Sequence, residues 1–512
     1  MKLTNIKAHL LFSLLTALGV GAIVAALSPG GFWRGWLAAA LLCWLGFFGL
    51  LRILAWAEGG KGLAWMTALA FFLRLGVGLA MHQALPIYGY PDEPTQHAGY
   101  VFYDAYRRDL QSWDLAQSGE SLLDSFGRDF YADQYGGLLA LSAALYRYLS
   151  PDAHRPALIL PLGAFATALG LPFFWKGVRK RWDGSVAAAA GWILALYPDG
   201  ILFGASQMRE PFLVGLTCIA FWAVLTFFDH RRSRGVILAA SFLGMVLISW
   251  RVALVIAGIL TVWFWIEYLL PRSQRWRILG WVVLALGVLG LAYLSWEWFR
   301  SAAQLDIKLT TLESGWVKKV IDEVGRQWTL PFVLGYGLAQ PILPAAIAEP
   351  TIPIWRIIAV PRAAGWYILA PFLLYAFFAI WRVPQPAERR ILGWLVGFVF
   401  LWILISSARA GGDLWDNPRY RSIFLPWLAL LAGWGAVWAV RARDTWLARW
   451  LIVEGIFLYY FTNWYFSRHL LLWKRLPFWQ NVLRITLLSA LVLGSGWLWD
   501  LGKVLWRRYK KG

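Results

Sequence analysis

Long apolar runs separated by short polar segments recur along the whole chain. A run of about 17 to 25 residues is long enough, as a helix, to cross a hydrocarbon layer about 30 Å thick. The runs here are continuous and rich in Leu, Ala and Trp, whereas strands of a membrane barrel alternate polar and apolar positions over about ten residues. The pattern therefore predicts an all-α, polytopic membrane protein.

About fourteen membrane-spanning helices are expected. They are drawn at residues 10–28, 36–56, 63–82, 156–175, 185–204, 211–228, 236–250, 252–270, 277–296, 364–381, 391–406, 422–440, 447–466 and 481–498. One further apolar run, Gly136 to Leu149, is predicted to lie along the external interface, because counting it as a span would move the basic turn at 176–181 outside.

This layout predicts three parts. Residues 1–62 form an extra pair of N-terminal helices, and residues 63–440 form a core with external loops at 83–155 and 297–363. Residues 441–512 form the last helices and a basic cytoplasmic tail.

Composition and charge agree with a membrane location. Charged residues make up 15% of the chain, whereas soluble domains carry about 25%. The net charge of +20 comes largely from Lys and Arg in short loops, which fall on one side of the predicted membrane. The positive-inside rule makes that side cytoplasmic, and such loops attract anionic lipids. We therefore expect a multi-pass plasma-membrane protein whose basic loops contact membrane lipids rather than nucleic acid.

Two neighbouring carboxylates are candidates for chemistry just outside the third span. Asp92 and Glu93 lie where a side chain can reach a lipid headgroup, and two carboxylates can divide proton transfer and cation binding between them. The alternative is a solvated pair in a loop. His97 could bind a divalent metal ion together with Asp92 and Glu93, or it could be a hydrogen-bonded interfacial histidine.

Four arginines are predicted on the same external side, against the charge bias of the chain. They are Arg209, Arg251, Arg419 and Arg421, the last two near the end of an external loop. The guanidinium group offers a fixed fork of donors that fits phosphate oxygens. The alternative for each is a snorkelling side chain or a partner for Glu210, Asp413 or Asp416.

The order of these features resembles the GT-C membrane glycosyltransferases, in particular family 39 and the lipid A aminoarabinose transferase-like group. The matching features are an arginine in the third span followed by the Asp-Glu pair, an Arg-Pro entry to the next span in "HRPALILPLGAF", the basic turn "KGVRKRWDG", and Arg419 and Tyr420 ahead of Pro426. The match covers roughly residues 63–440. The chain departs from the family at Gln134, Tyr135 and Gly136, where the interfacial helix often opens with Pro-Pro or Lys-Pro.

The resemblance implies a GT-C-like fold and transfer of a sugar from a polyprenyl-phosphate donor to a lipid, glycan or protein acceptor outside the membrane. It implies Asp92 as the base, with Glu93 beside it, and arginines that hold the carrier phosphate. Acceptor or supporting contacts would come from His97, Asp133, Gln134, Tyr135, Glu210 and Tyr420. No phosphate-binding loop or dinucleotide fingerprint is present in a suitable context, so no nucleotide cofactor is expected.

Two other functions stay open. A flippase for lipid-linked glycans would place charged groups deep inside spans and carry inverted repeats. A polysaccharide polymerase or ligase would also use external arginines, and it would differ mainly in its donor.

Overall fold

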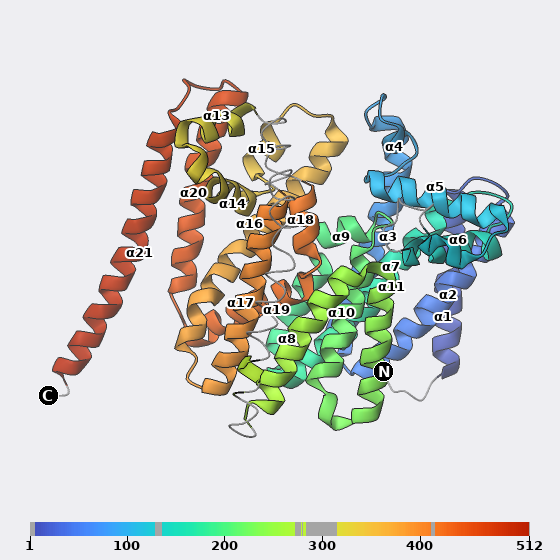
Figure 1. The fold of residues 1–512 in the computed structure, drawn as a ribbon, viewed down its shortest axis with the longest axis horizontal. Coiled ribbons are helices and arrows are strands. Elements are labelled where there is room, and N and C mark those ends of the chain that lie inside the picture. Colours follow the sequence, from blue (N-terminus) through green and yellow to red (C-terminus); the bar gives the residue numbers. More distant parts are fainter. Residues whose placement is uncertain are drawn as a thin grey trace. The chain divides into compact units, whose positions relative to one another are not determined.

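The computed structural model describes residues 6–127, 136–271, 278, 280–282, 315–410 and 415–510, and all regular elements in these ranges are helices. The chain forms two compact units (Figure 1). The first comprises Met1–Ser301 and Arg419–Leu430, and the second comprises Ala302–Pro418 and Leu431–Gly512. The three-part division predicted from the sequence differs from this grouping.

The first unit contains α1 (Ile6–Ala26), α2 (Phe32–Ala57), α3 (Gly60–Tyr88), α4 (Pro94–His97), α5 (Tyr103–Ser118), η1 (Leu122–Phe126), α6 (Gly137–Leu149), η2 (Pro156–Leu158), α7 (Leu160–Arg181), α8 (Gly184–Leu196), α9 (Pro198–Gly204), α10 (Glu210–Leu225), η3 (Phe227–Asp229), α11 (Arg231–Phe264) and η4 (Trp265–Leu269). It also receives the end of α18 (Asp416–Ser422) and the start of α19 (Leu425–Ala442).

The second unit contains α13 (Gly315–Val324), η5 (Arg326–Trp328), α14 (Thr329–Ala339), α15 (Leu343–Ala348), α16 (Pro353–Ala379), η6 (Ile380–Arg382), α17 (Pro386–Arg409), α20 (Trp446–His469) and α21 (Phe478–Tyr509). Part of the external loop predicted at 297–363 lies within the described residues. Its described residues include α13, α14 and α15, and α16 begins at Pro353.

Nine helices in the described ranges are long and apolar enough to cross a membrane, or ten if the bent pair α8 and α9 counts as one span. These nine helices cover ten of the predicted spans. The extra span arises because α11 and η4 together include two of them, 236–250 and 252–270. Helix α10 has only 16 residues, and α20 has 24 but is not among the nine. The predicted span 277–296 lies almost wholly outside the described residues. A helical, multi-pass membrane architecture is supported, whereas the count of fourteen and the GT-C fold stay predictions.

Helix α11 has a break where the sequence predicts a boundary between spans. A continuous helix of 34 residues would be about 50 Å long, more than a hydrocarbon layer about 30 Å thick. Ser249 leaves helical geometry, with φ −165° and ψ 92°, and Arg251 follows two residues later. The chain can therefore change direction at this point.

Helices α7 and α10 cross at very short range because both carry glycine at the crossing. A Cβ atom on Gly215 would lie 2.1 Å from the carbonyl oxygen of Ala166, and one on Gly170 would lie 2.7 Å from the Cα of Gly215. Small residues allow this kind of close backbone approach between membrane helices. The crossing fixes the start of α10, which carries part of the site described below.

Arg74 donates hydrogen bonds to the backbone carbonyl groups at the C-terminal end of α8. The chain bends by 52° between α8 and α9, and Pro198 cannot donate a hydrogen bond back to α8. The exposed carbonyl groups at a helix end need other donors. Arg74, fully buried in α3, donates to the carbonyl oxygens of Ala195 (3.0 Å) and Leu194 (3.2 Å).

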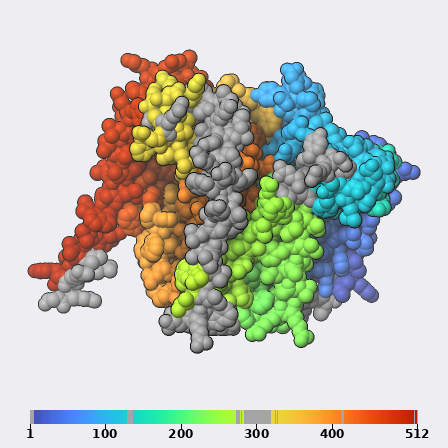
Figure 2. Space-filling view, in the orientation of Figure 1, coloured from blue at the N-terminus to red at the C-terminus, as the bar shows by residue number. Residues whose placement is uncertain are grey.

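A layer of short helices covers one end of the first unit. Helices α5 and α6 pack against each other and run across the ends of the longer helices (Figure 1). In the space-filling view they form the cyan and teal surface (Figure 2). The run Gly136 to Leu149 is helical from Gly137, which confirms the predicted element but does not test its interfacial location.

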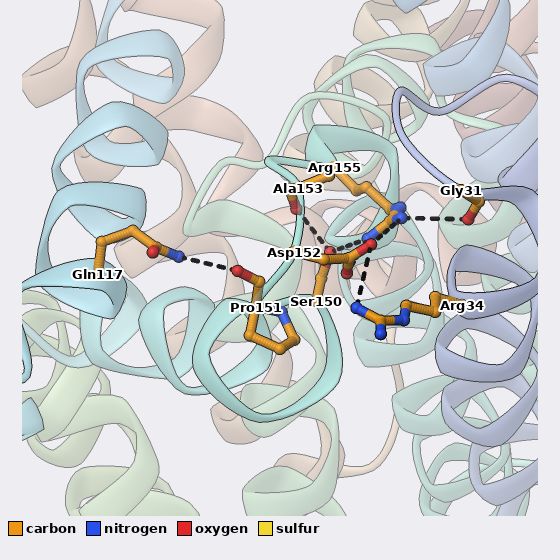
Figure 3. Close-up of polar contacts among 8 residues, drawn as sticks. All are labelled: Gly31, Arg34, Gln117, Ser150, Pro151, Asp152, Ala153 and Arg155. Carbon is orange, nitrogen blue, oxygen red and sulfur yellow. Dashed lines mark hydrogen bonds and ion pairs between the residues drawn. The ribbon is translucent and has the colours of Figure 1, made fainter.

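Arg155 connects the N-terminal helix pair to this layer (Figure 3). It is 1% exposed and donates to both carboxylate oxygens of Asp152, each at 2.9 Å, to Ser150 Oγ (2.6 Å) and to the carbonyl oxygen of Gly31 (3.2 Å). Gly31 precedes α2, so one buried guanidinium joins the turn between α1 and α2 to the segment before α7.

We expect Gly204→Ala to destabilise the protein. A Cβ atom there would lie 2.5 Å from Arg74 Cδ and 2.8 Å from its Cγ, so Arg74 would have to move away from the end of α8. Overpacking of this kind costs about 1–3 kcal/mol. Thermal unfolding in detergent measures the loss. The matched control is Gly76→Ala on α3, where a Cβ atom meets nothing within 4 Å, and an equal loss in both variants would contradict the explanation.

The contribution of Asp152 to stability should disappear in acid. Hydrogen bonds from Arg155 lower the pKa of Asp152 to about 2, whereas an unfolded aspartate has a pKa of about 3.9. Ionised Asp152 therefore stabilises the folded protein at any pH above its pKa in the unfolded chain. This stabilisation is lost as the pH falls toward the pKa of Asp152 in the folded protein. The melting temperatures of the wild type and Asp152→Asn should differ at neutral pH and converge as the pH falls from about 4 to about 2. A constant difference would contradict this.

Candidate functional site

Arg419 is the centre of a charged cluster built by three separate segments of the first unit. From α18, its Nε donates to Glu210 Oε1 at 2.7 Å, and its Nη1 donates to Asp104 Oδ2 at 2.8 Å. Glu210 begins α10, where the positive end of the helix favours a carboxylate, and Asp104 lies in the first turn of α5. We call Asp104, Glu210 and Arg419, with the two arginines described next, the Arg419 cluster.

Two further arginines make the cluster positive. Arg209 Nε lies 3.9 Å from Glu210 Oε1, and the charges of both Arg209 and Arg108 act on Asp104. Among the residues that the structure describes here, three guanidinium groups accompany two carboxylates. This excess of fixed positive charge is suited to an anionic ligand.

Burial differs sharply across the cluster. The side chains of Glu210 and Arg419 are 2% and 11% exposed, whereas Asp104 is 48% exposed. The cluster thus has an inner ion pair and an outer carboxylate that solvent reaches. Burial by itself would raise the pKa of Asp104, but the neighbouring Arg419 outweighs it, and the pKa lies below its usual value. Asp104 is therefore a weak proton acceptor near neutral pH.

The turn before Arg209 is held in an unusual backbone conformation. Gln207 has φ 51°, in the left-handed region that residues other than glycine rarely adopt. Arg108 Nη1 donates to the Gln207 carbonyl oxygen at 3.1 Å, and Gln207 Nε2 donates to the Pro156 carbonyl oxygen at 2.9 Å. Both bonds hold a strained turn that sets where α10 begins and where Arg209 lies.

The cluster lies at the ends of helices remote from the basic turns of the first unit. Helix α7 ends at Arg181, and α10 leads from Glu210 to the basic segment that opens α11 at Arg231. Arg209 and Glu210 are therefore at the opposite end of α10 from that segment. By the positive-inside rule, this would be the external end.

The structure brings together three of the residues singled out in the sequence, namely Arg209, Glu210 and Arg419. Arg421 is 2% exposed and Tyr420 is half-buried on the same short helix, α18. Arg251 is exposed on α11, with its guanidinium 5.5 Å from the ring centre of Trp250. Arg251 forms no ion pair within the described ranges, so it is not placed with the other arginines.

The acids that pair with the arginines are not the ones predicted. Asp92 and Glu93 are exposed in the turn before α4, and their side chains form no hydrogen bond or ion pair with the part of the chain that the structure describes. Asp104 and Glu210 form the ion pairs with Arg419 instead. Asp104 was missed, although its spacing of four residues from Arg108 on a helical segment could have marked it.

A metal site around His97 has no support from the geometry. His97 is exposed, and its Nε2 lies 2.6 Å from the Pro91 carbonyl oxygen, to which it can only donate. In the ranges the structure describes, no group of three or more His, Cys, Asp or Glu side chains could hold a metal ion. Asp133, Gln134, Tyr135 and Asp413 lie outside the described residues.

A second polar centre, around Asp109, stabilises the layer above the long helices. This fully buried carboxylate accepts hydrogen bonds from the hydroxyls of Tyr100 and Tyr146, both at 2.5 Å, and lies 2.6 Å from His154 Nε2. Burial and the nearby carboxylate raise the pKa of both tyrosines, which keeps them as neutral donors. The contacts join α5, α6 and the segment before α7, and no motif in the sequence marks these residues.

No protein-family model matches the chain, and comparison with curated proteins finds no match either.

Arg419→Met should be strongly destabilising, because it leaves Glu210 as a buried charge that has lost its main partner. Breaking a buried ion pair in this way costs about 3–5 kcal/mol. Asp104→Asn should change stability by less than about 1 kcal/mol, because an ion pair to a half-exposed carboxylate is screened by water. Chemical unfolding of the two variants tests the order, and a larger loss in Asp104→Asn would contradict it.

Proposed function

We propose that this protein is a membrane glycosyltransferase that uses a polyprenyl-phosphate-linked sugar as its donor. The observation that carries the proposal is the convergence of three guanidinium groups on two carboxylates among the described residues of the Arg419 cluster. A leaving phosphate needs positive charge where its own charge develops, and fixed arginines supply it without a nucleotide site. The resemblance to GT-C enzymes supports the same reaction, because its late Arg-Tyr element contains Arg419.

In the proposed reaction, the hydroxyl oxygen of an acceptor attacks the anomeric carbon of the donor sugar. The new carbon–oxygen bond forms as the bond from the anomeric carbon to the phosphate oxygen breaks, with inversion at the carbon. The electron pair leaves with the phosphate, and the hydroxyl proton passes to a carboxylate. Arg209 and Arg419 would contact the phosphate.

Asp92 stays the proposed base, with Glu93 beside it. Asp104 is unsuited to this role because the pKa lowered by Arg419 weakens it as a proton acceptor. Asp92 is exposed and is not committed to an ion pair within the described ranges. This assignment requires Asp92 to meet the acceptor when the donor is bound.

Arg209→Gln should weaken binding of the donor carrier while the protein stays folded. Loss of a charge-assisted hydrogen bond removes about 1.5–3 kcal/mol, or roughly 10- to 150-fold in affinity. The measurement compares stabilisation of the purified protein by polyprenyl phosphate and by polyprenol, which lacks the phosphate. The control is Arg251→Gln, an exposed arginine outside the Arg419 cluster. Equal stabilisation by the two lipids in the wild type would remove the phosphate from the proposal.

Asp92→Asn should abolish sugar transfer without changing the melting temperature, because its exposed side chain makes no contact on which stability depends. Transfer is measured in liposomes that contain a lipid-linked sugar and candidate acceptors, and Asp124→Asn is a control carboxylate. Wild-type activity in Asp92→Asn would exclude Asp92 as the base.

One observation favours a flippase as a second candidate. Glu454 lies within α20, and its Oε1 is buried without a partner in the described part of the chain. An ionisable group at membrane depth is a common feature of transport pathways. Glu267, which lies in η4, is instead explained by its ion pair with Arg181 at 2.8 Å. The liposome experiment separates the two functions, since a flippase would move the lipid-linked sugar without forming an acceptor product.

A further inference from the structure

Glu210 of the Arg419 cluster also lines a small cavity in the first unit. Its volume, measured as space open to the centre of a water molecule, is about 10 Å³. A single water needs about 10–15 Å³ by the same measure. The lining includes Arg74, Glu210, Thr167, Ser422, Phe203 and Val214, all of them buried. The cavity is too small for a sugar, a phosphate or a lipid chain.

The two charged residues that line this cavity each have one buried polar atom with no hydrogen bond to the described part of the chain. Glu210 uses Oε1 to accept from Arg419, but its buried Oε2 has no hydrogen bond within the described ranges. Arg74 uses its Nη1 and Nη2 groups on backbone carbonyls, but its buried Nε has no partner there. A buried polar atom left unpaired costs about 1–3 kcal/mol, so two such atoms on residues that line one cavity require an explanation.

We propose that the cavity holds one bound water molecule, which accepts a hydrogen bond from Arg74 Nε and donates one to Glu210 Oε2. Water is suited to both roles because it donates and accepts. An anion would be repelled by the carboxylate of Glu210, and a cation would be repelled by the guanidinium of Arg74. Thr167 and Ser422 also line the cavity, and a hydroxyl group from either residue would bring the water to the three or so bonds that a buried water makes.

The water makes Arg74 a positioning residue for the Arg419 cluster. Charges then alternate from the surface inward: Asp104 is negative, Arg419 positive, Glu210 negative and Arg74 positive, with the water between the last two. Glu210 is held on both oxygens, so its Oε1 stays directed at Arg419. This inference does not depend on the proposed reaction, and the tests below need no substrate.

The first test is an experimental structure of the intact protein, at a resolution that shows ordered waters elsewhere in the first unit. We expect a peak within hydrogen-bond distance of both Arg74 Nε and Glu210 Oε2. An empty cavity in such a map, or a direct contact between the two side chains, would overturn the proposal.

The second test is a double-mutant cycle with Arg74→Met and Glu210→Gln, measured by melting temperature. A water bridge predicts that the melting temperature of the double variant falls by less than the sum of the two single decreases. Each single change already breaks the bridge, so the second change has no bridge left to break. The matched control combines Arg74→Met with Asp152→Asn, whose carboxylate pairs with Arg155, and the losses should add. Additive losses in both cycles would show that Arg74 and Glu210 are not coupled.

Discussion

The first unit depends on one constraint, which is that a charge removed from water must have a partner. Its large buried side chains include three arginines, Arg74, Arg155 and Arg421. An unpaired buried guanidinium or carboxylate would cost several kcal/mol, so each such group dictates the position of its neighbours. Arg419 is an example, because it forms ion pairs with Glu210 at the start of α10 and with Asp104 in α5. The layer of short helices is thus tied electrostatically to the helices beneath it.

Arginine is used here both for structure and for the candidate chemistry. Arg74 completes the end of a helix that a proline has interrupted, and Arg155 holds a turn between distant segments. Arg209 and Arg419 instead gather where one neighbouring carboxylate stays accessible to solvent. The difference lies in what surrounds each guanidinium. Arg74 and Arg155 are enclosed by backbone carbonyls and a single carboxylate, whereas the described part of the Arg419 cluster combines three guanidinium groups with a carboxylate that solvent reaches.

The sequence was sufficient for the helical class and for most helix positions, because hydrophobic run length follows directly from the thickness of the membrane. It also pointed to Arg209, Glu210 and Arg419, since charges beside apolar runs stand out. It could not reveal that Asp104 is the outer partner of Arg419, because the two residues are 315 positions apart. The sequence predicted a boundary between two spans next to Ser249. It did not predict the role of Arg74, because the bend that exposes the carbonyls of α8 exists only in three dimensions.

The anchoring of Gly31 by Arg155 changes how the N-terminal helix pair should be regarded. The resemblance to GT-C enzymes implies that residues 1–62 are an addition to the core. Yet Arg155 is enclosed by Gly30, Gly31 and the segment before α7, and a Cβ atom on Gly30 would lie 2.8 Å from its Nη2. A homologue that lacked this pair would expose the guanidinium on its flank and lose the carbonyl that receives it. Arg155 and the first two helices should therefore be gained or lost together during evolution. An alignment of homologues would then show arginine at position 155 only in chains that carry both helices.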